Sequence, residues 1–340
     1  MSKNNKNQKK TLKILCIVLI AIVLFLLAFF FAVRGYFRLP VRDYYKASVK
    51  GFKIPGLSDN LIAQGLSYDD KSDCFFVTGY MNDKSASPIY IVDKKSKMTI
   101  KKVLLKDENG DVYAGHAGGL SVHGDYVYVA GSKKGTLVVF SYDEIQDALD
   151  GDYVTSLGTF KVSDNYSVAY TTATDTQITV GEFYRPGNYE TDASHKLTTA
   201  AGDYNQAIAV TYNFSDSETA VFGIDPTPVL VYSTTDAVQG MAFNSQKVYL
   251  STSYGPSFSN IYVYDLSKLE ASKTFNFNGT EAPLLELDSA SLECVKKIAP
   301  MSEEIEFVDG LMYTMCESAS NKYIFGKFTS AKWCYATKMD

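Results

Sequence analysis

Five similar groups of β-strand-forming segments follow one another along this sequence of 340 residues. In each group, a segment rich in β-branched and aromatic residues follows a turn rich in Asp, Asn, Ser or Gly. These segments are residues 74–81, 126–133, 177–184, 248–255 and 311–318, and a further strand-like segment follows at 89–93, 136–142, 207–214, 261–265 and 322–328. Short strands that recur with little intervening helix are typical of a β-propeller, in which each blade is a four-stranded sheet.

The spacing of the first strand of each group predicts an all-β fold, a five-bladed β-propeller. Aligned apolar positions in these strands are Leu66, Leu120, Val168, Met241 and Ile305, which are 54, 48, 73 and 64 residues apart. A six-bladed propeller is the alternative, because the 73-residue interval has room for another small sheet. We expect instead that residues 185–206 of this interval form a long loop on the rim. An immunoglobulin-like sandwich uses about 100 residues, too few to account for this chain.

The two ends of the repeat region predict how the ring closes. The last group begins at Met301 and lacks an outer strand, whereas residues 52–57 (FKIPGL) form an outer strand without a blade of its own. We therefore expect the N-terminal strand to complete the last blade. This pairing would leave only short, protected sheet edges.

One segment near the N-terminus predicts a membrane anchor. Residues 14–33 are twenty consecutive apolar residues, and a helix of that length spans the hydrocarbon core of a bilayer at ~1.5 Å per residue. A cleaved signal peptide has an apolar region of about 7–15 residues and a small-residue cleavage site, so we expect an uncleaved signal-anchor. The chain then divides into a basic cytoplasmic tail (1–13), the transmembrane anchor (14–33), a stalk (34–50) and an extracytoplasmic β-propeller (51–340) in a single-pass cell-membrane protein.

The charge of the chain limits which partners it is expected to bind, and its cysteines leave its redox state open. Residues 1–50 hold ten of the 33 Lys and Arg residues and one of the 38 Asp and Glu residues, so the remainder has a formal net charge of −14. Nucleic acid requires clustered Lys and Arg and is therefore not expected as a partner. We expect the lipid bilayer to surround residues 14–33, and a small molecule or an extracellular protein or peptide to bind the propeller. Disulfides and buried reduced thiols are both consistent with the four cysteines outside the anchor. These are Cys74, Cys294, Cys316 and Cys334.

In a propeller, the starts of the inner strands and the ends of the second strands meet at one mouth of the central channel. Gln64 and Gln239 occupy the same position of the repeat, each before a glycine, and are expected to face this mouth. Clustered carboxylates in a concave site shift one another's pKa values or bind a cation, so the mouth is the predicted ligand site and calcium is one candidate occupant. The predicted site residues are Gln64, His116, Tyr166, Glu182, Arg185, Gln239, Tyr254, Glu303, Glu304 and Glu317. We expect His123 and His195 on the surface.

One stretch of the sequence resembles a known family. Residues 63–96, AQGLSYDDKSDCFFVTGYMNDKSASPIYIVDKKS, are similar to the first blade of secreted five-bladed propellers of the plant-type glutaminyl cyclase group, and less closely to lactonase-type and other periplasmic propellers. The resemblance implies amide cyclisation by a carboxylate in a Glu-Gly-Leu start of the second blade. This chain reads HAGGLS there, with Gly118 in place of the acid, and Glu182 or Glu303 would have to take that role from another blade.

Two functions follow from these observations. The first is a membrane-anchored propeller that binds a small ligand or a partner protein at the channel mouth. The alternative is an enzyme at the same mouth, performing either glutaminyl-cyclase-like amide cyclisation or metal-dependent hydrolysis of a lactone or ester. The candidate groups for this chemistry are Glu182, Glu303, Glu304 and His116. Because a propeller accommodates both, the fold alone does not decide between them.

Overall fold

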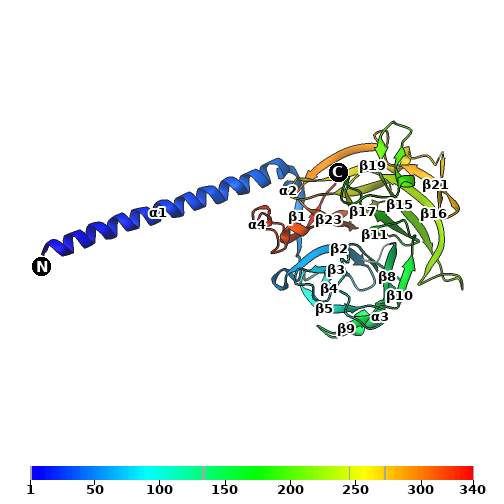
Figure 1. Ribbon diagram of the computed structural model, residues 1–340, viewed down its shortest axis with the longest axis horizontal. Helices are drawn as coiled ribbons and strands as arrows, with labels where there is room; N and C mark the ends of the chain where they lie inside the picture. Colours follow the sequence, from blue (N-terminus) through cyan, green and yellow to red (C-terminus); the bar gives the residue numbers. More distant parts are fainter. Residues whose placement is uncertain (1, 132–134, 245, 272, 340) are drawn as a thin grey trace.

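The computed structural model describes residues 2–131, 135–244, 246–271 and 273–339. These residues form five β-sheets around one axis and a long N-terminal helix, so the fold is a five-bladed β-propeller preceded by an apolar helix (Figure 1). The predicted fold class is confirmed.

Within the described residues, each blade has four antiparallel strands that run in order from the channel to the rim, and blades 1 and 3 carry additional strands at the rim. Blade 1 contains β2 (Leu61–Asp69), β3 (Cys74–Met81), β4 (Pro88–Asp93), β5 (Thr99–Lys106) and the parallel β9 (Tyr153–Thr155). Blade 2 contains β6 (Leu120–His123), β7 (Tyr126–Ala130), β8 (Thr136–Ser141) and β10 (Gly158–Lys161). Blade 3 contains β11 (Val168–Ala173), β12 (Gln177–Glu182), β15 (Ala207–Phe214), β16 (Ile224–Thr234), and the added β21 (Thr280–Glu286) and β20 (Lys273–Phe277). Blade 4 contains β17 (Val238–Asn244), β18 (Lys247–Thr252), β19 (Ser259–Asp265) and β22 (Leu292–Ile298). Blade 5 contains β23 (Ser302–Val308), β24 (Leu311–Cys316), β25 (Trp333–Thr337) and β1 (Ser48–Lys53).

The inner strands contact one another in a closed ring. Strand β2 contacts β6 and β23, β6 contacts β11, β11 contacts β17, and β17 contacts β23. Residues 183–206, which are all described, contain only a short 3-10 helix (Ala193–His195) and the small hairpin of β13 (Leu197–Thr198) and β14 (Tyr204–Asn205). The interval therefore holds a long loop and no sixth blade, as the sequence predicts.

The hydrophobic core lies between neighbouring blades because each sheet is apolar on both faces. Phe160 of blade 2 and Ile178 of blade 3 belong to one such cluster, and Phe75 of blade 1 and Cys334 of blade 5 belong to another. Tyr44 of α2 (Arg42–Ala47) fills part of the cluster between blades 4 and 5. Burial of one large apolar side chain contributes about 1.5–3 kcal/mol, so the blades stabilise one another.

The chain closes its ring by pairing its two ends. Strand β1 is antiparallel to β25, with Ser48 opposite Thr337 and Lys50 opposite Tyr335. The predicted closure of the last blade by the N-terminal strand is confirmed. The strand itself begins at Ser48, four residues before the predicted start at Phe52.

The predicted third strand of the last blade, residues 322–328, is wrong. This segment lies in a loop, residues 317–332, that contains α4 (Gly326–Thr329), and β25 begins only at Trp333. Gly326 packs directly on the backbone of Ser318, which leaves no room for a side chain at that position. The strand prediction rested on the aromatic residues of this segment. One of them, Phe325, packs outside the sheet, where its ring stacks on Phe37 of the N-terminal helix.

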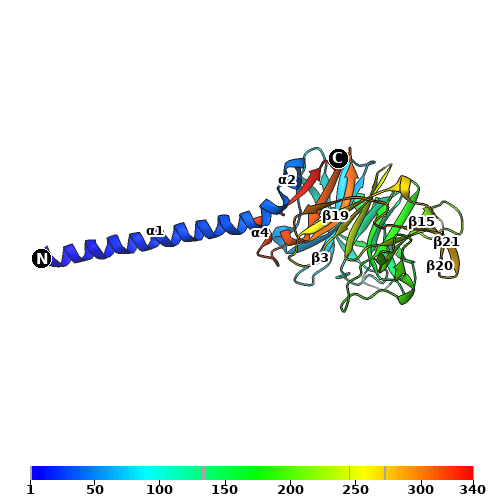
Figure 2. The same cartoon turned by 90° about the horizontal axis from the view of Figure 1, so that it is seen from above.

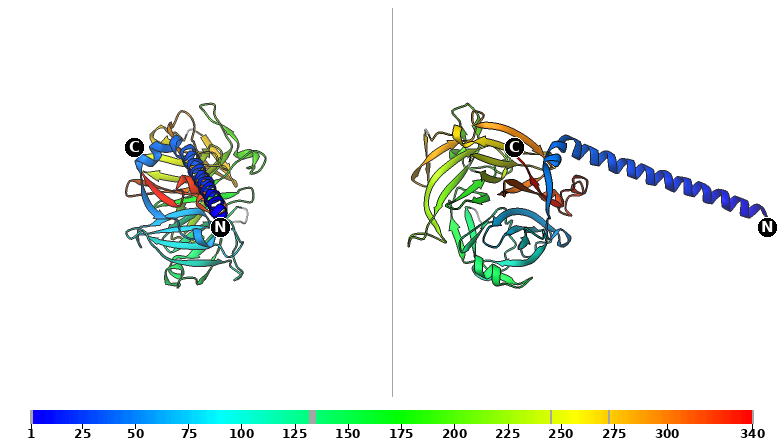
Figure 3. Two further views of the ribbon diagram at one scale, coloured as in Figure 1. Left: turned by 90° about the vertical axis from the view of Figure 1, so that its left-hand side faces the viewer. Right: turned by 180° about the vertical axis from the view of Figure 1, so that it is seen from behind.

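The N-terminal helix α1 (Ser2–Arg38) is long and apolar enough to cross a membrane, by length and composition. It leaves the rim of the ring beside α4, and neither end of the channel lies against it (Figures 2 and 3). A 3-10 turn (Leu39–Val41) and α2 then lead into β1, so residues 34–47, predicted as a stalk, are helical. Outside the helix, the cysteines are free thiols.

Candidate ligand site at the channel mouth

Irregular pairing at one end of the inner strands brings polar side chains to the channel. The pairing with the second strand shifts between Ala63 and Leu66 in β2, between Val238 and Gly240 in β17, and between Ser302 and Ile305 in β23. A bulge turns the extra residue away from the regular alternation of the strand. Gln64, Gln239 and Glu303 lie at these three bulges, and all of them line one cavity.

The cavity at this mouth has a volume of about 740 Å³. This volume falls in the range of small-molecule sites, about 300–1,000 Å³. Six of the predicted site residues line it, and these are Gln64, His116, Gln239, Tyr254, Glu303 and Glu317. The remaining walls include four aromatic side chains, those of Tyr80, Phe183, Tyr189 and Tyr323.

Two carboxyl groups lie together in the cavity. Glu303 is only 2% exposed, and no described residue donates a hydrogen bond to its carboxyl group. Burial raises the pKa of Glu303 well above its ordinary value, and the neighbouring Glu317 and Glu304 raise it further. Burial also raises the pKa of Glu317, against the effect of hydrogen bonds from Tyr323 and Tyr80. A site of this kind favours either protonated acids or a bound cation.

The hydrogen bonds of Glu317 fix one side of the mouth. Its Oε1 accepts from the hydroxyl of Tyr80 at 3.1 Å and from the hydroxyl of Tyr323 at 2.9 Å. The Lys322 ammonium donates to the Tyr80 oxygen at 3.0 Å. The ring of His116 stacks on Tyr80 with centroids 4.9 Å apart. Burial and the nearby Lys322 lower the pKa of His116, which favours a neutral imidazole at neutral pH.

Glu304 does not line the cavity and instead joins three blades beneath it. Its Oε2 accepts from the backbone N–H groups of Leu66 at 2.6 Å and Leu120 at 2.9 Å, and its Oε1 accepts from Thr171 N–H at 3.3 Å. Burial raises the pKa of Glu304, while these three N–H groups act in the opposite direction. Gly240 lies against it, since a Cβ there would be 2.6 Å from the Glu304 Cα. Its place in the structure is therefore that of a structural carboxyl group.

The bonds of Glu304 also correct the alignment of blade 3. Thr171 N–H occupies the place that the N–H groups of Leu66 and Leu120 have in their blades, three residues later than the predicted Val168. The mouth position of blade 3 is consequently Ala169, which lines the cavity. Tyr166 lies in the core, and its hydroxyl donates to the carbonyl groups of Val180 at 2.6 Å and Ile208 at 2.9 Å.

Glu182 is held away from the cavity by a histidine of the long loop. It is fully buried, and its Oε2 lies 2.9 Å from Nδ1 of His195. His195 is 4% exposed, so the prediction that it lies on the surface is wrong. The loop folds back over blade 3 and buries this pair, an arrangement that the sequence of the loop alone does not reveal.

Arg185 does not line the cavity but lies beside it, with its guanidinium carbon 3.5 Å from the centroid of the Tyr254 ring. Among the side chains that the structure describes, no three His, Cys, Asp or Glu residues are grouped so that they could hold a metal ion. Calcium at the mouth therefore stays a prediction, without a cluster of carboxylate ligands among these side chains.

Sequence reasoning missed several residues of this mouth. Lys322 and Tyr323 were assigned to a strand that does not form, and Phe183, Tyr189 and Glu190 belong to the long loop. Tyr80 was not missed in this way, because it lies near the end of a second strand, where the repeat predicts mouth residues, and it lines the cavity. The position of a loop residue at the mouth depends on how the loop packs, which strand periodicity does not encode.

Comparison with protein-family models and with curated proteins found no match. Among solved structures, the glutaminyl cyclase of Myxococcus xanthus is 10% identical, with a TM-score of 0.44, over 86% of this chain and 94% of that one. The PQQ-bound aldose sugar dehydrogenase of Streptomyces coelicolor is 14% identical, with a TM-score of 0.37, over 79% and 76%. BamB of Moraxella catarrhalis is 10% identical, with a TM-score of 0.33, over 76% and 83%.

Proposed function

We propose that this chain is a single-pass membrane protein whose propeller lies outside the cytoplasm and binds a small ligand or peptide with a protonated amine at the channel mouth. The observation that carries the proposal is the position of Glu303, a buried carboxyl group that faces a cavity without a hydrogen bond from a described residue. A cation in the cavity would stabilise the charged forms of Glu303 and Glu317 together. The strongest interaction of the ligand is then with these two groups.

The aromatic walls suit the same chemistry. Tyr80, Phe183 and Tyr254 line the cavity with the two carboxyl groups. An ammonium group near an aromatic face gains about 0.5–2 kcal/mol, with the larger values in desolvated sites. The lining contains three carboxyl groups and one ammonium, that of Lys322. Glu190 is paired with Lys196 at 2.6 Å, so Glu303 and Glu317 are the carboxyl groups that would receive a cation.

A pair of dipeptides tests the binding proposal. Full-length protein in a neutral detergent is titrated with a free-amine dipeptide such as glutaminyl-alanine amide, and with its N-acetylated form, while its thermal unfolding is followed. We expect the free amine alone to raise the unfolding temperature. Because a charged hydrogen bond contributes about 1.5–3 kcal/mol, Glu303→Gln should weaken binding about 10-fold or more.

The control for this titration is Glu218→Gln. Glu218 is exposed in the loop between β15 and β16, away from the mouth. The Glu218→Gln variant should bind the dipeptide as the wild type does. The proposal would be contradicted if the wild type responded equally to the free and the acetylated peptide. It would also be contradicted if Glu303→Gln responded to the free peptide as the wild type does.

Amide cyclisation is the second candidate function, and the raised pKa of Glu303 favours it. A carboxyl group with a raised pKa can act as a general acid. As the neutral peptide amine attacks the side-chain amide of an N-terminal Gln, Glu303 would give its proton to the amide nitrogen, which leaves as ammonia, and the resulting carboxylate would take up the proton that the amine loses. Pyroglutamate formation from glutaminyl-alanine amide, measured with wild type and Glu303→Gln, tests this reaction. Equal rates with the two proteins and with buffer would exclude cyclisation and leave the binding proposal to be judged by the titration.

The extracytoplasmic location is supported by the apolar helix, its short basic tail and the acidic remainder of the chain. Protease added to intact cells should cut the propeller region, whereas an epitope placed before residue 7 should be reached only after the membrane is permeabilised. The reverse pattern would place the propeller in the cytoplasm.

A further inference from the structure

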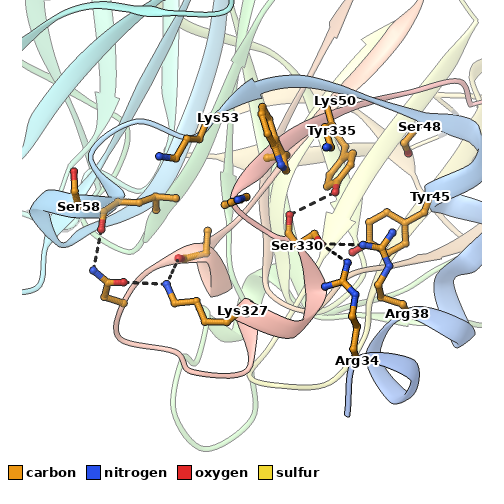
Figure 4. A pocket seen from close by; sticks show the side chains of 16 residues that line it. Arg34, Arg38, Tyr45, Ser48, Lys50, Lys53, Ser58, Lys327, Ser330 and Tyr335 are labelled. Atoms are coloured by element: carbon orange, nitrogen blue, oxygen red, sulfur yellow. Dashed lines mark hydrogen bonds between the residues drawn. The ribbon is translucent and has the colours of Figure 1, made fainter. Parts of the chain in front are cut away.

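A second cavity lies on the outside of the ring, between the C-terminal end of α1, strand β1 and the loop 317–332. Its volume is about 960 Å³, and Figure 4 shows basic side chains entering it from all three elements. The basic lining residues are Arg34, Arg38, Lys50, Lys53, Lys327 and Lys332. Among the residues that the structure describes, no Asp or Glu lines this cavity. This concentration of positive charge is unlike the propeller as a whole, which is acidic.

These cations have no carboxylate partner among the described residues. Within the part of the chain that the structure describes, none of the six forms an ion pair. Lys53 and Lys332 make no side-chain hydrogen bond to a described residue, and both are exposed. Positive charges that line the same cavity without carboxylate partners repel one another. The cavity is therefore suited to an anion with several oxygen acceptors.

Neutral groups hold the two arginines in place. Arg34 and Arg38 both donate to the Ser330 Oγ, at 3.1 and 2.9 Å, and Arg34 also donates to the Phe328 carbonyl at 3.2 Å. The Arg38 guanidinium carbon is 4.0 Å from the centroid of the Tyr45 ring. The guanidinium groups are thus ordered without losing their charge, and their planar forks match phosphate oxygens.

The position of the cavity along α1 places it where the apolar segment ends. Arg34 follows directly on the apolar residues 14–33. Phe30, inside the apolar segment, packs against Phe328 with ring centroids 5.4 Å apart, and Ile324 of the same loop is 78% exposed. If α1 crosses the bilayer, the loop meets the surface of the hydrocarbon core and the cavity opens among the headgroups. Trp and Tyr, here Trp333 and Tyr45, are enriched at this depth.

We propose that this cavity binds the phosphate of an anionic phospholipid headgroup. The proposal rests on the membrane anchoring proposed above but not on the ligand at the channel mouth. Basic pockets beside transmembrane helices bind such headgroups. In the topology proposed above the cavity faces the outer leaflet, so the ligand would be an anionic lipid of that leaflet. A headgroup in the cavity joins α1, β1 and the loop 317–332, and so holds blade 5 against the membrane.

Lipid titration of the full-length protein tests this site. Protein in a neutral maltoside detergent receives increasing amounts of phosphatidylglycerol, phosphatidylcholine or inorganic phosphate, and its unfolding temperature is recorded. The test variant is Lys53→Gln with Lys332→Gln. The control variant is Lys95→Gln with Lys268→Gln, which removes two exposed lysines that do not line the cavity.

We expect phosphatidylglycerol to stabilise the wild type and the control, and phosphatidylcholine to have little effect. The test variant should unfold at the wild-type temperature without lipid and need about 30-fold more phosphatidylglycerol for the same shift, because two basic contacts are lost. Identical phosphatidylglycerol titrations of the two variants would overturn the proposal. Equal stabilisation by inorganic phosphate at the same concentration would also overturn it, in favour of a site for a free anion.

Discussion

The Oε2 atom of Glu304 accepts the backbone N–H of Leu66 at 2.6 Å, and so links blade 5 to blade 1 across 238 residues of sequence. The same carboxyl group accepts N–H groups from blades 2 and 3. A single side chain on the channel axis thus satisfies donors that the ends of the inner strands leave unpaired.

Removing the Glu304 carboxyl group should destabilise the ring. Glu304→Ala leaves three buried N–H groups without an acceptor, each costing about 1–3 kcal/mol, so the free energy of unfolding should fall by about 3 kcal/mol or more. Glu304→Gln keeps one acceptor oxygen and should lose less. Chemical denaturation measures both. Stability of the Ala variant equal to that of Glu218→Gln would show that these hydrogen bonds do not hold the blades together.

Ring closure depends on a glycine in β1. A Cβ on Gly51 would lie 2.9 Å from the carbonyl oxygen of Cys334 and 2.9 Å from the Tyr313 ring. Overpacking of this kind costs about 1–3 kcal/mol, so Gly51→Ala should lower the unfolding temperature measured by scanning calorimetry. Gly35→Ala is the matched control, because its nearest neighbour would be an ordinary 3.8 Å from the new Cβ. Equal unfolding temperatures would mean that β1 is not a tightly packed part of blade 5.

The pH dependence of stability should report Glu303. Its pKa in the folded chain is raised above the ordinary value of 4.5, so the folded state keeps a proton that the unfolded state loses as the pH rises above about 4.5. Stability is therefore highest below this value and falls as the pH rises toward the folded pKa, by at most about 1.4 kcal/mol per pH unit for one proton. Glu303→Gln should flatten this slope in denaturation curves between pH 5 and pH 7. An unchanged slope would contradict the raised pKa.

The pair formed by Glu182 and His195 should anchor the long loop. Replacing His195 with Ala leaves a fully buried carboxyl group without this partner, which costs about 1–3 kcal/mol or more. Limited proteolysis of His195→Ala should therefore cut residues 183–206 several-fold faster than in the wild type. His123→Ala is the control, since this ring stacks on Phe214 in another part of the protein. Equal cleavage rates would show that the loop is held by other contacts.

The sequence predicted the fold better than the site, for a physical reason. Strand periodicity and turn residues are local signals, and they identified the inner strands that carry Leu66, Leu120, Met241 and Ile305. They misplaced blade 3 by three residues, because Tyr166 resembles an inner-strand residue but is buried between blades. Which residues face the channel depends on bulges and on loop packing, and both are set by contacts between blades.

The two adjacent acids Glu303 and Glu304 show the same limit. They are neighbours in sequence, and both were predicted to belong to the ligand site. At the bulge in β23, however, Glu303 lines the cavity, whereas Glu304 accepts hydrogen bonds from the backbone of three other blades. Pattern analysis finds the acidic pair but does not tell which member is structural. The distinction comes from the N–H groups that surround one of them.

A crystal structure of the protein with glutaminyl-alanine amide tests the central claim most directly. The account predicts that the peptide ammonium lies within hydrogen-bond distance of the Glu303 carboxyl group, in the cavity lined by Gln64, Gln239 and Glu317. A peptide bound elsewhere on the propeller, or an ammonium that avoids Glu303 while the peptide occupies the cavity, would contradict it.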